Sequence, residues 1–380
     1  MFNDKIPPKK ILLIATQQIG DVLLSTPLIK SMRMAWPDAV IDVLVYRNTS
    51  GILMGNSDCN SVIESDNHPT FSAYLKLLKR IFRKYDLAVT TQGNDRAHQY
   101  AFLAGKKRVG LIPNLKKKHW WKKLSCMRWS LLDENNTHTV VQNLLLADLM
   151  GIERQYALTP PKLGSTDSIT RLNQLLNFNL TETTYTIIHP LPMWQYKRWT
   201  DSGWIALIQQ LLNLGQRVII TGGPAIAEQN YAQQLTEHFV ESATGFVTSL
   251  AGKTSFAEMS LLLNHATAYV GPDTATTHLA AACGTPTLAI FGPTNPVKWA
   301  PWPIGYHKNE SPWQRYSSEY QMVMNVMLLQ GRGECVPCHK AGCNDHNNSH
   351  SQCLDTLDTK RVIQAFRRLI KIDIEVVSVE

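Results

Sequence analysis

Short apolar runs, each followed by a segment with helical spacing, recur in both halves of the chain. The run Lys10–Ala15 opens such a series in the first half, and Tyr185–His189 opens a similar one in the second. Buried parallel strands are continuous apolar runs, and strands that alternate with helices build a parallel sheet covered on both faces. The pattern therefore predicts an α/β protein with two doubly wound halves facing each other across a cleft.

A stretch rich in Pro and Gly without periodicity, residues 159–165, separates the two series. Such composition is typical of a linker. We therefore predict an N-terminal domain at residues 1–165 and a C-terminal domain at 166–355, followed by an amphipathic helix and tail at 356–380 that is available to pack back on the first domain. The length of 380 residues and the hydrophobic fraction of 44% suit two such domains and exclude a disordered chain.

Positive charge is concentrated in the first half. Residues 1–165 hold 23 Lys and Arg against 13 Asp and Glu, a net charge of +10, whereas the remainder holds 15 against 17, a net charge of −2. Such asymmetry indicates that the first half meets an anionic partner, which nucleic acid, a membrane surface or a phosphorylated substrate would each satisfy. No recognised nucleic-acid motif accompanies the charge, so we expect no nucleic-acid partner.

The segment 106–128 holds nine of these cations and two tryptophans but no acidic residue, and the helical segment 71–84 adds further cations beside aromatic residues. Tryptophan favours membrane interfaces, and anionic head groups attract Lys and Arg. A solvated charged face is the structural alternative. We predict acceptor or membrane-surface contacts for Lys116, Lys117, Lys118, Trp120, Trp121, Lys122 and Lys123.

The segment 271–284, directly after a predicted strand, carries the strongest local signal. Asp273 or Thr274 can cap a helix whose N-terminus faces the carboxyl edge of the sheet, where phosphates bind in open α/β proteins. His278 lies four residues after Thr274 and therefore on the same helical face. The structural alternative is an ordinary capped helix with His278 in the core.

Two flanking strands end in loops that favour a close approach of backbone to the same ligand. Gly222 and Gly223 end one strand, and Gly292 and Thr294 follow the other. Glycine permits such an approach, although a simple turn explains each loop equally well. Neither a GxGxxG fingerprint nor a GxxxxGK[ST] loop is present, which disfavours a nicotinamide dehydrogenase and a P-loop NTPase.

Two charged residues are candidate catalytic groups. Lys197 lies among aromatic residues after the first strand of the second half, where a cation can neutralise a pyrophosphate and stabilise a leaving group. Asp21 lies at a strand-to-helix turn of the first half, where a carboxylate can accept a proton from an attacking hydroxyl. The structural alternatives are a solvated loop for Lys197 and a helix N-cap for Asp21.

Four of the seven cysteines fall within nineteen residues: Cys335, Cys338, Cys343 and Cys353. The CxxC start suits a tetrahedral zinc site, but the later spacings do not form a standard second pair. Structural zinc, reduced thiols in a loop and a disulfide are all open alternatives. We expect a reducing cytoplasmic location, because no export signal or membrane-spanning run is apparent.

Four separated motifs carry a family resemblance: Ile19–Asp21, Lys197–Trp199, Gly271–Thr274 with His278, and Phe291–Thr294. Together they resemble glycosyltransferase family 9, the lipopolysaccharide core heptosyltransferases. The sequence of Trp194–Lys197 and the four cysteines are most similar to the heptosyltransferase III type. The resemblance implies a GT-B fold of two Rossmann-like domains, in which the first binds mainly the acceptor and the second mainly ADP-L-glycero-D-manno-heptose.

The resemblance also implies roles for individual residues. The donor would be held by Lys197, Asp273, Thr274 and His278. Asp21 would be the general base. Ala275 stands where members often have Gly, which a helix tolerates, and Pro192-Met193 replaces a Thr pair found in some members, so donor contacts from that loop differ here.

The implied reaction is a single inverting displacement, in which Asp21 takes a proton from an acceptor heptose hydroxyl while ADP departs. Asp-x-Asp is absent, so no metal cofactor is expected for catalysis, and a helix N-terminus with Lys197 would replace the cation. The implied acceptor is a phosphorylated, lipid-anchored inner core. The enzyme would then act from the cytoplasm as a peripheral protein on the anionic inner face of the inner membrane.

Three alternatives compete with this prediction. They are a transferase for a different nucleotide-sugar, a sugar-nucleotide 2-epimerase of GT-B architecture, and a non-catalytic protein that binds a membrane surface. An epimerase would turn over a UDP-sugar without an acceptor, and a silent binder would retain donor affinity without turnover.

Overall fold

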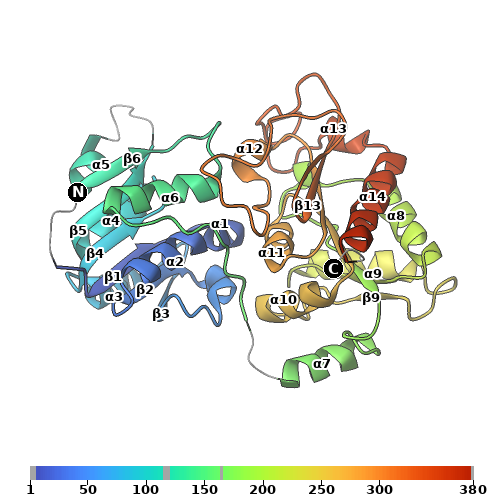
Figure 1. The fold of residues 1–380 in the computed structure, drawn as a ribbon, viewed down its shortest axis with the longest axis horizontal. Coiled ribbons are helices and arrows are strands. Elements are labelled where there is room, and N and C mark those ends of the chain that lie inside the picture. Colours follow the sequence, from blue (N-terminus) through green and yellow to red (C-terminus); the bar gives the residue numbers. More distant parts are fainter. Residues whose placement is uncertain (1–5, 114–119, 163–165, 378–380) are drawn as a thin grey trace. The chain divides into compact units, whose positions relative to one another are not determined.

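The computed structural model describes residues 6–113, 120–162 and 166–377. By its internal contacts the chain divides into two units. The first unit comprises residues 1–161 with 305–311, and the second comprises 162–304 with 312–380. Each unit contains a sheet of its own, flanked by helices (Figure 1).

The sheet of the first unit has six parallel strands in the order β3-β2-β1-β4-β5-β6. Strand β1 is apolar and buried from Ile11 onward, which suits its central place between β2 and β4. The strands are β1 (Lys10–Ile14), β2 (Val40–Tyr46), β3 (Ser61–Ser65), β4 (Tyr85–Thr90), β5 (Gly105–Ile112) and β6 (Arg128–Leu131).

The helices of the first unit form two layers. Helix α2 packs on α6, whereas α3 packs on α4 and α4 packs on α5. The side chains of Thr70 and Asn94 accept backbone hydrogen bonds at the starts of α3 and α4, as N-cap residues do. The helices are α1 (Ile19–Leu24), α2 (Thr26–Ala35), η1 (Arg47–Leu53), α3 (Phe71–Ile81), α4 (Asp95–Ala104), α5 (Trp120–Ser125) and α6 (Thr139–Met150).

The sheet of the second unit has seven strands in the order β12-β13-β11-β10-β7-β8-β9. Only β12, at one edge, runs antiparallel to its neighbour in this sheet. The strands are β7 (Tyr185–Ile188), β8 (Arg217–Ile220), β9 (Val247–Ser249), β10 (Ala268–Pro272), β11 (Thr287–Phe291), β12 (Gln321–Val323) and β13 (Val326–Gln330). The strand order of both units is that of a doubly wound sheet, which confirms the α/β prediction.

The last helix packs within the second unit. Helix α14 contacts α8, β11 and β13, and its buried Phe366 belongs to the same hydrophobic core as Trp204. Val362, Ala365 and Leu369 of α14 belong to this core too, and packing of the tail on the first domain stays a prediction. The helices are α7 (Thr166–Leu176), η3 (Gln195–Lys197), α8 (Asp201–Asn213), α9 (Ile226–Glu237), α10 (Phe256–His265), α11 (Ala275–Cys283), α12 (Pro296–Trp299), α13 (Gln352–Asp355) and α14 (Thr359–Val377).

Candidate functional site

The strand order of the second unit reverses between β7 and β10, which are hydrogen-bonded neighbours. Ligands of open α/β sheets bind beyond the carboxyl ends of strands at this switch point. His189 follows β7 there, and its backbone N–H donates to the Val270 carbonyl of β10 at 3.0 Å. Asp273 follows β10, so the sheet brings these two chain segments to one edge.

A lysine and an aspartate from distant parts of the sequence meet at this edge. The Lys197 ammonium, at the end of η3, lies 2.6 Å from Oδ2 of Asp273. The lysine side chain is 18% exposed and the aspartate is buried. The neighbouring Tyr196 carbonyl accepts a hydrogen bond from Ser351 Oγ at 2.6 Å, which holds this loop in place. The ion pair therefore sets a partly buried cation beside the end of β10.

Helix α11 begins at the same point with an open N-terminus. Thr274 is its N-cap residue, but the threonine side chain makes no capping bond to the helix backbone. Its Oγ1 lies 3.2 Å from Oγ1 of Thr277, which in turn donates to the Pro272 carbonyl at 2.5 Å. Asp273, the other predicted cap, instead pairs with Lys197. The first-turn N–H groups and the helix dipole therefore face the switch point, an arrangement that attracts anions.

A buried histidine completes this edge. Nδ1 of His278 is buried and has no hydrogen-bond partner within the part of the chain that the structure describes. Burial lowers the pKa of His278 to about 4; Asp273 opposes this effect and Lys197 adds to it. The imidazole is therefore neutral near pH 7 and presents a nitrogen able to meet a ligand hydroxyl.

His189 lies beside this site, although it was not among the residues predicted for it. Its Nδ1 lies 3.0 Å from Oγ1 of Thr221, and burial lowers its pKa to about 4. The signal for His189 was its position immediately after an apolar strand. Because Thr221 follows β8, the histidine joins the ends of two neighbouring strands.

The predicted glycines of the donor loops have local structural reasons for lacking a side chain. The Gly223 N–H donates to Oε2 of Glu228 at 2.6 Å, and a Cβ at Gly223 would lie 2.8 Å from the same carboxylate. A Cβ at Gly222 would lie 3.2 Å from the methyl of Ala251, and one at Gly292 would lie 2.7 Å from Leu354. These close contacts within the protein disfavour a larger residue at the three positions whether or not a ligand approaches.

The loop around Lys197 is not the solvated segment of the structural alternative. Trp199 is buried, and its Nε1–H donates to the Leu357 carbonyl at 3.1 Å. Arg198 pairs with Asp201 at 2.6 Å and stacks 4.4 Å from the Tyr231 ring centroid. A cavity of about 280 Å³ is lined by Arg198 and its neighbours but includes neither Lys197 nor Asp273. Lys197 therefore pairs with Asp273 at the switch point, whereas the adjacent Arg198 pairs with Asp201.

Asp21 lies in the first unit, as the third residue of α1. The N-cap of this helix is Gln18, so the alternative role of Asp21 as an N-cap is wrong. The order of this sheet reverses between β1 and β4, where Thr16 Oγ1 donates to Oε1 of Gln92 at 2.9 Å. Helix α1 follows β1 along the chain, so the half-buried Asp21 lies near the end of β1, at this switch point.

Comparison with known proteins identifies the family of this chain. The family model for glycosyltransferase family 9 (heptosyltransferase) matches residues 74–322. The chain belongs to glycosyltransferase family 9. It is 30% identical to lipopolysaccharide heptosyltransferase 3 of Escherichia coli K12 over 74% of this chain and 82% of that protein. It is also 22% identical to lipooligosaccharide heptosyltransferase 2 of Haemophilus influenzae, over 75% and 84%. The expected resemblance to the heptosyltransferase III type is confirmed.

Solved structures agree with the fold. The E. coli ADP-heptose lipopolysaccharide heptosyltransferase II matches with a TM-score of 0.71 at 18% identity, over 96% of this chain and 99% of that one. The E. coli heptosyltransferase WaaC with ADP matches with a TM-score of 0.68 at 20% identity, over 95% and 99%. The fold is therefore GT-B, and the enzyme is a glycosyltransferase of the heptosyltransferase type that acts in lipopolysaccharide biosynthesis.

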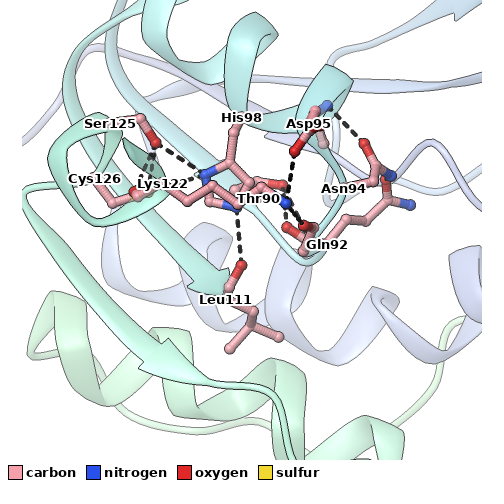
Figure 2. Close-up of polar contacts among 11 residues, drawn as sticks. Thr90, Gln92, Asn94, Asp95, His98, Leu111, Lys122, Ser125 and Cys126 are labelled. Atoms are coloured by element: carbon pink, nitrogen blue, oxygen red, sulfur yellow. Dashed lines mark hydrogen bonds and ion pairs between the residues drawn. The ribbon is translucent and has the colours of Figure 1, made fainter. Parts of the chain in front are cut away.

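The predicted acceptor or membrane surface of this transferase needs one correction. Lys122 is only 2% exposed, and its ammonium donates to the Gly93 carbonyl at 2.5 Å and lies 2.7 Å from Oδ1 of Asp95 (Figure 2). A lysine held in this way cannot contact an acceptor or a membrane, so its predicted surface role is wrong. Trp120 is exposed, Trp121 and Lys123 are half-buried, and Lys116, Lys117 and Lys118 lie outside the described residues.

The polar cluster around Lys122 ties α4 and α5 to the sheet. Nδ1 of His98 lies 3.0 Å from Oγ of Ser125, and its Nε2 lies 3.0 Å from the Leu111 carbonyl (Figure 2). Burial lowers the pKa of this histidine, although its hydrogen bond with Leu111 opposes the shift. With both ring nitrogens engaged, His98 has a structural position, in contrast to His278.

The four clustered cysteines of the transferase lie near one another in the second unit. All are free thiols, so the disulfide alternative is not what the structure contains. Burial raises the pKa of the Cys353 thiol to about 12, and the nearby Cys338, Cys335 and Cys343 add to the shift. Among the described residues, no three His, Cys, Asp or Glu side chains form a group able to hold a metal. None of the described helices is long and apolar enough to cross a membrane.

Proposed function

We propose that this enzyme transfers L-glycero-D-manno-heptose from ADP-heptose to the phosphorylated inner core of lipopolysaccharide, with inversion at the anomeric carbon. The observation that carries the proposal is the Lys197–Asp273 pair beside the open N-terminus of α11, together with the Nδ1 of His278 that has no partner among the described residues. Related solved structures support the donor, since WaaC of E. coli has been solved with ADP and with ADP-2-deoxy-2-fluoro heptose.

The donor pyrophosphate would bind at the N-terminus of α11. The N–H groups of Ala275 and Thr276, in the first helical turn, have no acceptor within the helix. They would donate hydrogen bonds to phosphate oxygens. The Lys197 ammonium would add a full positive charge, and its ion pair with Asp273 keeps that charge in position before the donor arrives. Neutral His278 would bind a donor hydroxyl. Gly222, Gly223, Gly292 and Thr294 would supply the surrounding donor loops.

The reaction itself needs one proton acceptor and one stabilised leaving group. As the acceptor oxygen forms its bond to the anomeric carbon, the bond from that carbon to the phosphate oxygen breaks and its electron pair leaves with ADP. Lys197 and the helix N-terminus stabilise the charge that grows on the leaving phosphate. Asp21, at the switch point of the first unit, would take the proton of the acceptor hydroxyl.

The acceptor would be lipid-anchored, so the enzyme would work in the cytoplasm as a peripheral protein on the anionic inner face of the inner membrane. The net charge of +10 on residues 1–165 supports this setting, because cations are attracted to anionic lipid head groups and to core phosphates. No nucleic-acid partner is proposed.

The cysteine cluster has the donor chemistry of a structural zinc site, since four thiolates suit zinc. The thiols are not gathered as metal ligands among the described residues, so the proposed reaction takes no step through a metal there. Elemental analysis of the purified protein decides between zinc and reduced thiols. Zinc that is present in the wild type and absent from a variant with Cys335, Cys338, Cys343 and Cys353 all changed to Ser would assign the metal to them, and no zinc in the wild type would leave reduced thiols.

The proposed function is tested by ADP release from ADP-heptose, measured with and without a heptose-containing truncated core, for the wild type and Asp21→Ala. We expect release that depends on the acceptor and falls by about 100-fold or more in the variant, as loss of a general base predicts. Asp38→Ala, a change of the same kind outside α1, is the control.

Other outcomes of this assay would redirect the proposal. Turnover of a UDP-sugar without acceptor would indicate an epimerase, and turnover with another nucleotide-sugar alone would change the donor. Binding of ADP-heptose without any turnover would indicate a non-catalytic binding protein. Equal rates for Asp21→Ala and the wild type would remove Asp21 from the reaction.

A further inference from the structure

A groove lies in the first unit where α3, α4 and α5 pack on one another. Its volume is about 400 Å³, and mostly apolar side chains line it. The lining residues include Tyr74 from α3, Phe102 and Leu103 from α4, and Trp121 and Leu124 from α5. The proposed transfer reaction makes no use of this groove.

Large apolar side chains stand in solvent around the groove. Leu124 is 70% exposed, Trp120 is 63% exposed, and Phe102 is 54% exposed. Trp120 and Leu124 are four residues apart on α5 and therefore share one face of that helix. Single exposed apolar residues are common, but a group of them around an apolar groove marks a contact surface.

Cations border the same groove. The Arg108 guanidinium lies 5.1 Å from the ring centroid of Phe102. The Arg83 backbone N–H donates to the Leu103 carbonyl at 2.8 Å, so the arginine that ends the α3 region adjoins the groove wall. On the side of α3 away from Tyr74, Lys76, Lys79 and Arg80 are exposed, and within the described ranges no carboxylate forms an ion pair with them.

We propose that this surface is a membrane-inserting face: Phe102, Trp120 and Leu124 enter an anionic phospholipid bilayer, and the groove takes up lipid hydrocarbon. Arg83 and Arg108 would then meet the phosphate head groups, and the exposed cations of α3 would add to the attraction of the anionic surface. A bilayer is the partner that presents hydrocarbon and a dense anionic layer together, and Trp and Arg suit the boundary between them.

This inference deepens the proposed function and rests on it, because a lipid-anchored acceptor requires the enzyme at the membrane. It differs from the surface predicted from sequence in the residues that enter the membrane. Phe102 and Leu124 replace the buried Lys122 as the contacting groups. The sequence signal for Leu124 was weak, since it lies alone among lysines and a serine.

The test measures co-sedimentation of the full chain with vesicles of phosphatidylethanolamine and phosphatidylglycerol, and with vesicles of phosphatidylcholine alone. We compare the wild type with Leu124→Glu and with Leu214→Glu, a matched control whose leucine is 44% exposed in the second unit. We expect Leu124→Glu to weaken binding to the anionic vesicles by about tenfold or more, because an apolar contact is lost and a negative charge meets the head groups. Leu214→Glu should bind as the wild type does.

Two results would overturn the inference. One is equal binding by Leu124→Glu and Leu214→Glu, and the other is equal binding of the wild type to anionic and neutral vesicles. Tight binding to heparin or nucleic acid with no binding to vesicles would also overturn it, and would assign the face to another polyanion. Trp120→Glu repeats the test at a second exposed position.

A parallel assay separates this inference from the proposed function. Transfer of heptose is measured to an acceptor embedded in the vesicles and to the same acceptor after deacylation. We expect Leu124→Glu to lower the ratio of the two rates by about tenfold. Transfer without vesicle binding would contradict the membrane-inserting face alone, and vesicle binding without transfer to either acceptor would contradict the proposed function alone.

Discussion

The two units place a lysine–aspartate pair in very different surroundings. In the second unit, Lys197 meets Asp273 at a strand end beside an open helix N-terminus. In the first unit, Lys122 meets Asp95 but also donates to the Gly93 carbonyl and is 2% exposed. An ion pair alone therefore does not distinguish a ligand-binding lysine from a structural one. The surroundings do, because an open helix N-terminus lies beside Lys197, whereas Lys122 also bonds a backbone carbonyl.

The same contrast holds for the two buried histidines. His98 in the first unit engages both ring nitrogens, with Ser125 and with the Leu111 carbonyl. His278 in the second unit has no partner for Nδ1 within the described residues. Buried polar groups are usually satisfied, so the exception indicates where a ligand atom belongs.

Lys197→Ala is the substitution with the largest expected effect. It removes the cation proposed to stabilise the leaving phosphate, so kcat for heptose transfer should fall by roughly 100- to 1,000-fold. The free energy of unfolding should fall as well, because the buried Asp273 carboxylate loses its counter-charge. Steady-state kinetics with ADP-heptose measures the effect, and Arg198→Ala, in the adjacent ion pair, is the control. A loss of stability without a loss of kcat would make Lys197 structural.

Lys122→Met should lower the stability of the protein and leave kcat for heptose transfer unchanged. The half-buried Gly93 carbonyl loses its hydrogen bond from a charged donor, which costs about 1–3 kcal/mol in the free energy of unfolding. Urea denaturation measures this change, and Lys123→Met, on the same helix, serves as the comparison. A fall in kcat at unchanged stability would instead place Lys122 in the acceptor site.

The histidines provide the smallest expected effect. His278→Asn should raise KM for ADP-heptose by roughly tenfold at pH 7, as the loss of one hydrogen bond to the donor predicts. His98→Asn should leave that KM unchanged and lower the free energy of unfolding. Equal effects of both substitutions on KM would contradict the assignment of His278 alone to the donor site.

The low pKa of His278 also predicts how stability depends on pH. Its pKa is about 4 in the folded protein and about 6.5 in the unfolded chain, so between these values the unfolded state binds more protons. The free energy of unfolding should therefore fall as pH is lowered from about 6.5 toward 4, by on the order of 1–2 kcal/mol at pH 5. Urea unfolding at pH 7 and pH 5 should show a smaller fall in His278→Asn than in the wild type.

Much of the fold followed from the order of residues along the chain. The runs at Lys10–Ala15 and Tyr185–His189 are apolar enough to be buried on both sides of a parallel sheet, so their position in the sequence predicted their structure. Short strands such as β3 and β9 were not predicted, because Ser61–Ser65 and Val247–Ser249 mix polar and apolar residues over few positions. These strands lie at the ends of their sheets, where one neighbour suffices.

The candidate site divides in the same way. Residue type and position predicted a helix N-terminus after Gly271 and indicated Lys197, Asp273 and His278 individually, because local spacing determines where a helix begins and which face a residue occupies. Three features depend on residues brought together by the tertiary structure: the pairing of Lys197 with Asp273, the lack of a partner for Nδ1 of His278 within the described ranges, and the burial of Lys122. The physical reason is that burial and electrostatic partners are properties of neighbours in space, and here those neighbours are far apart in the chain.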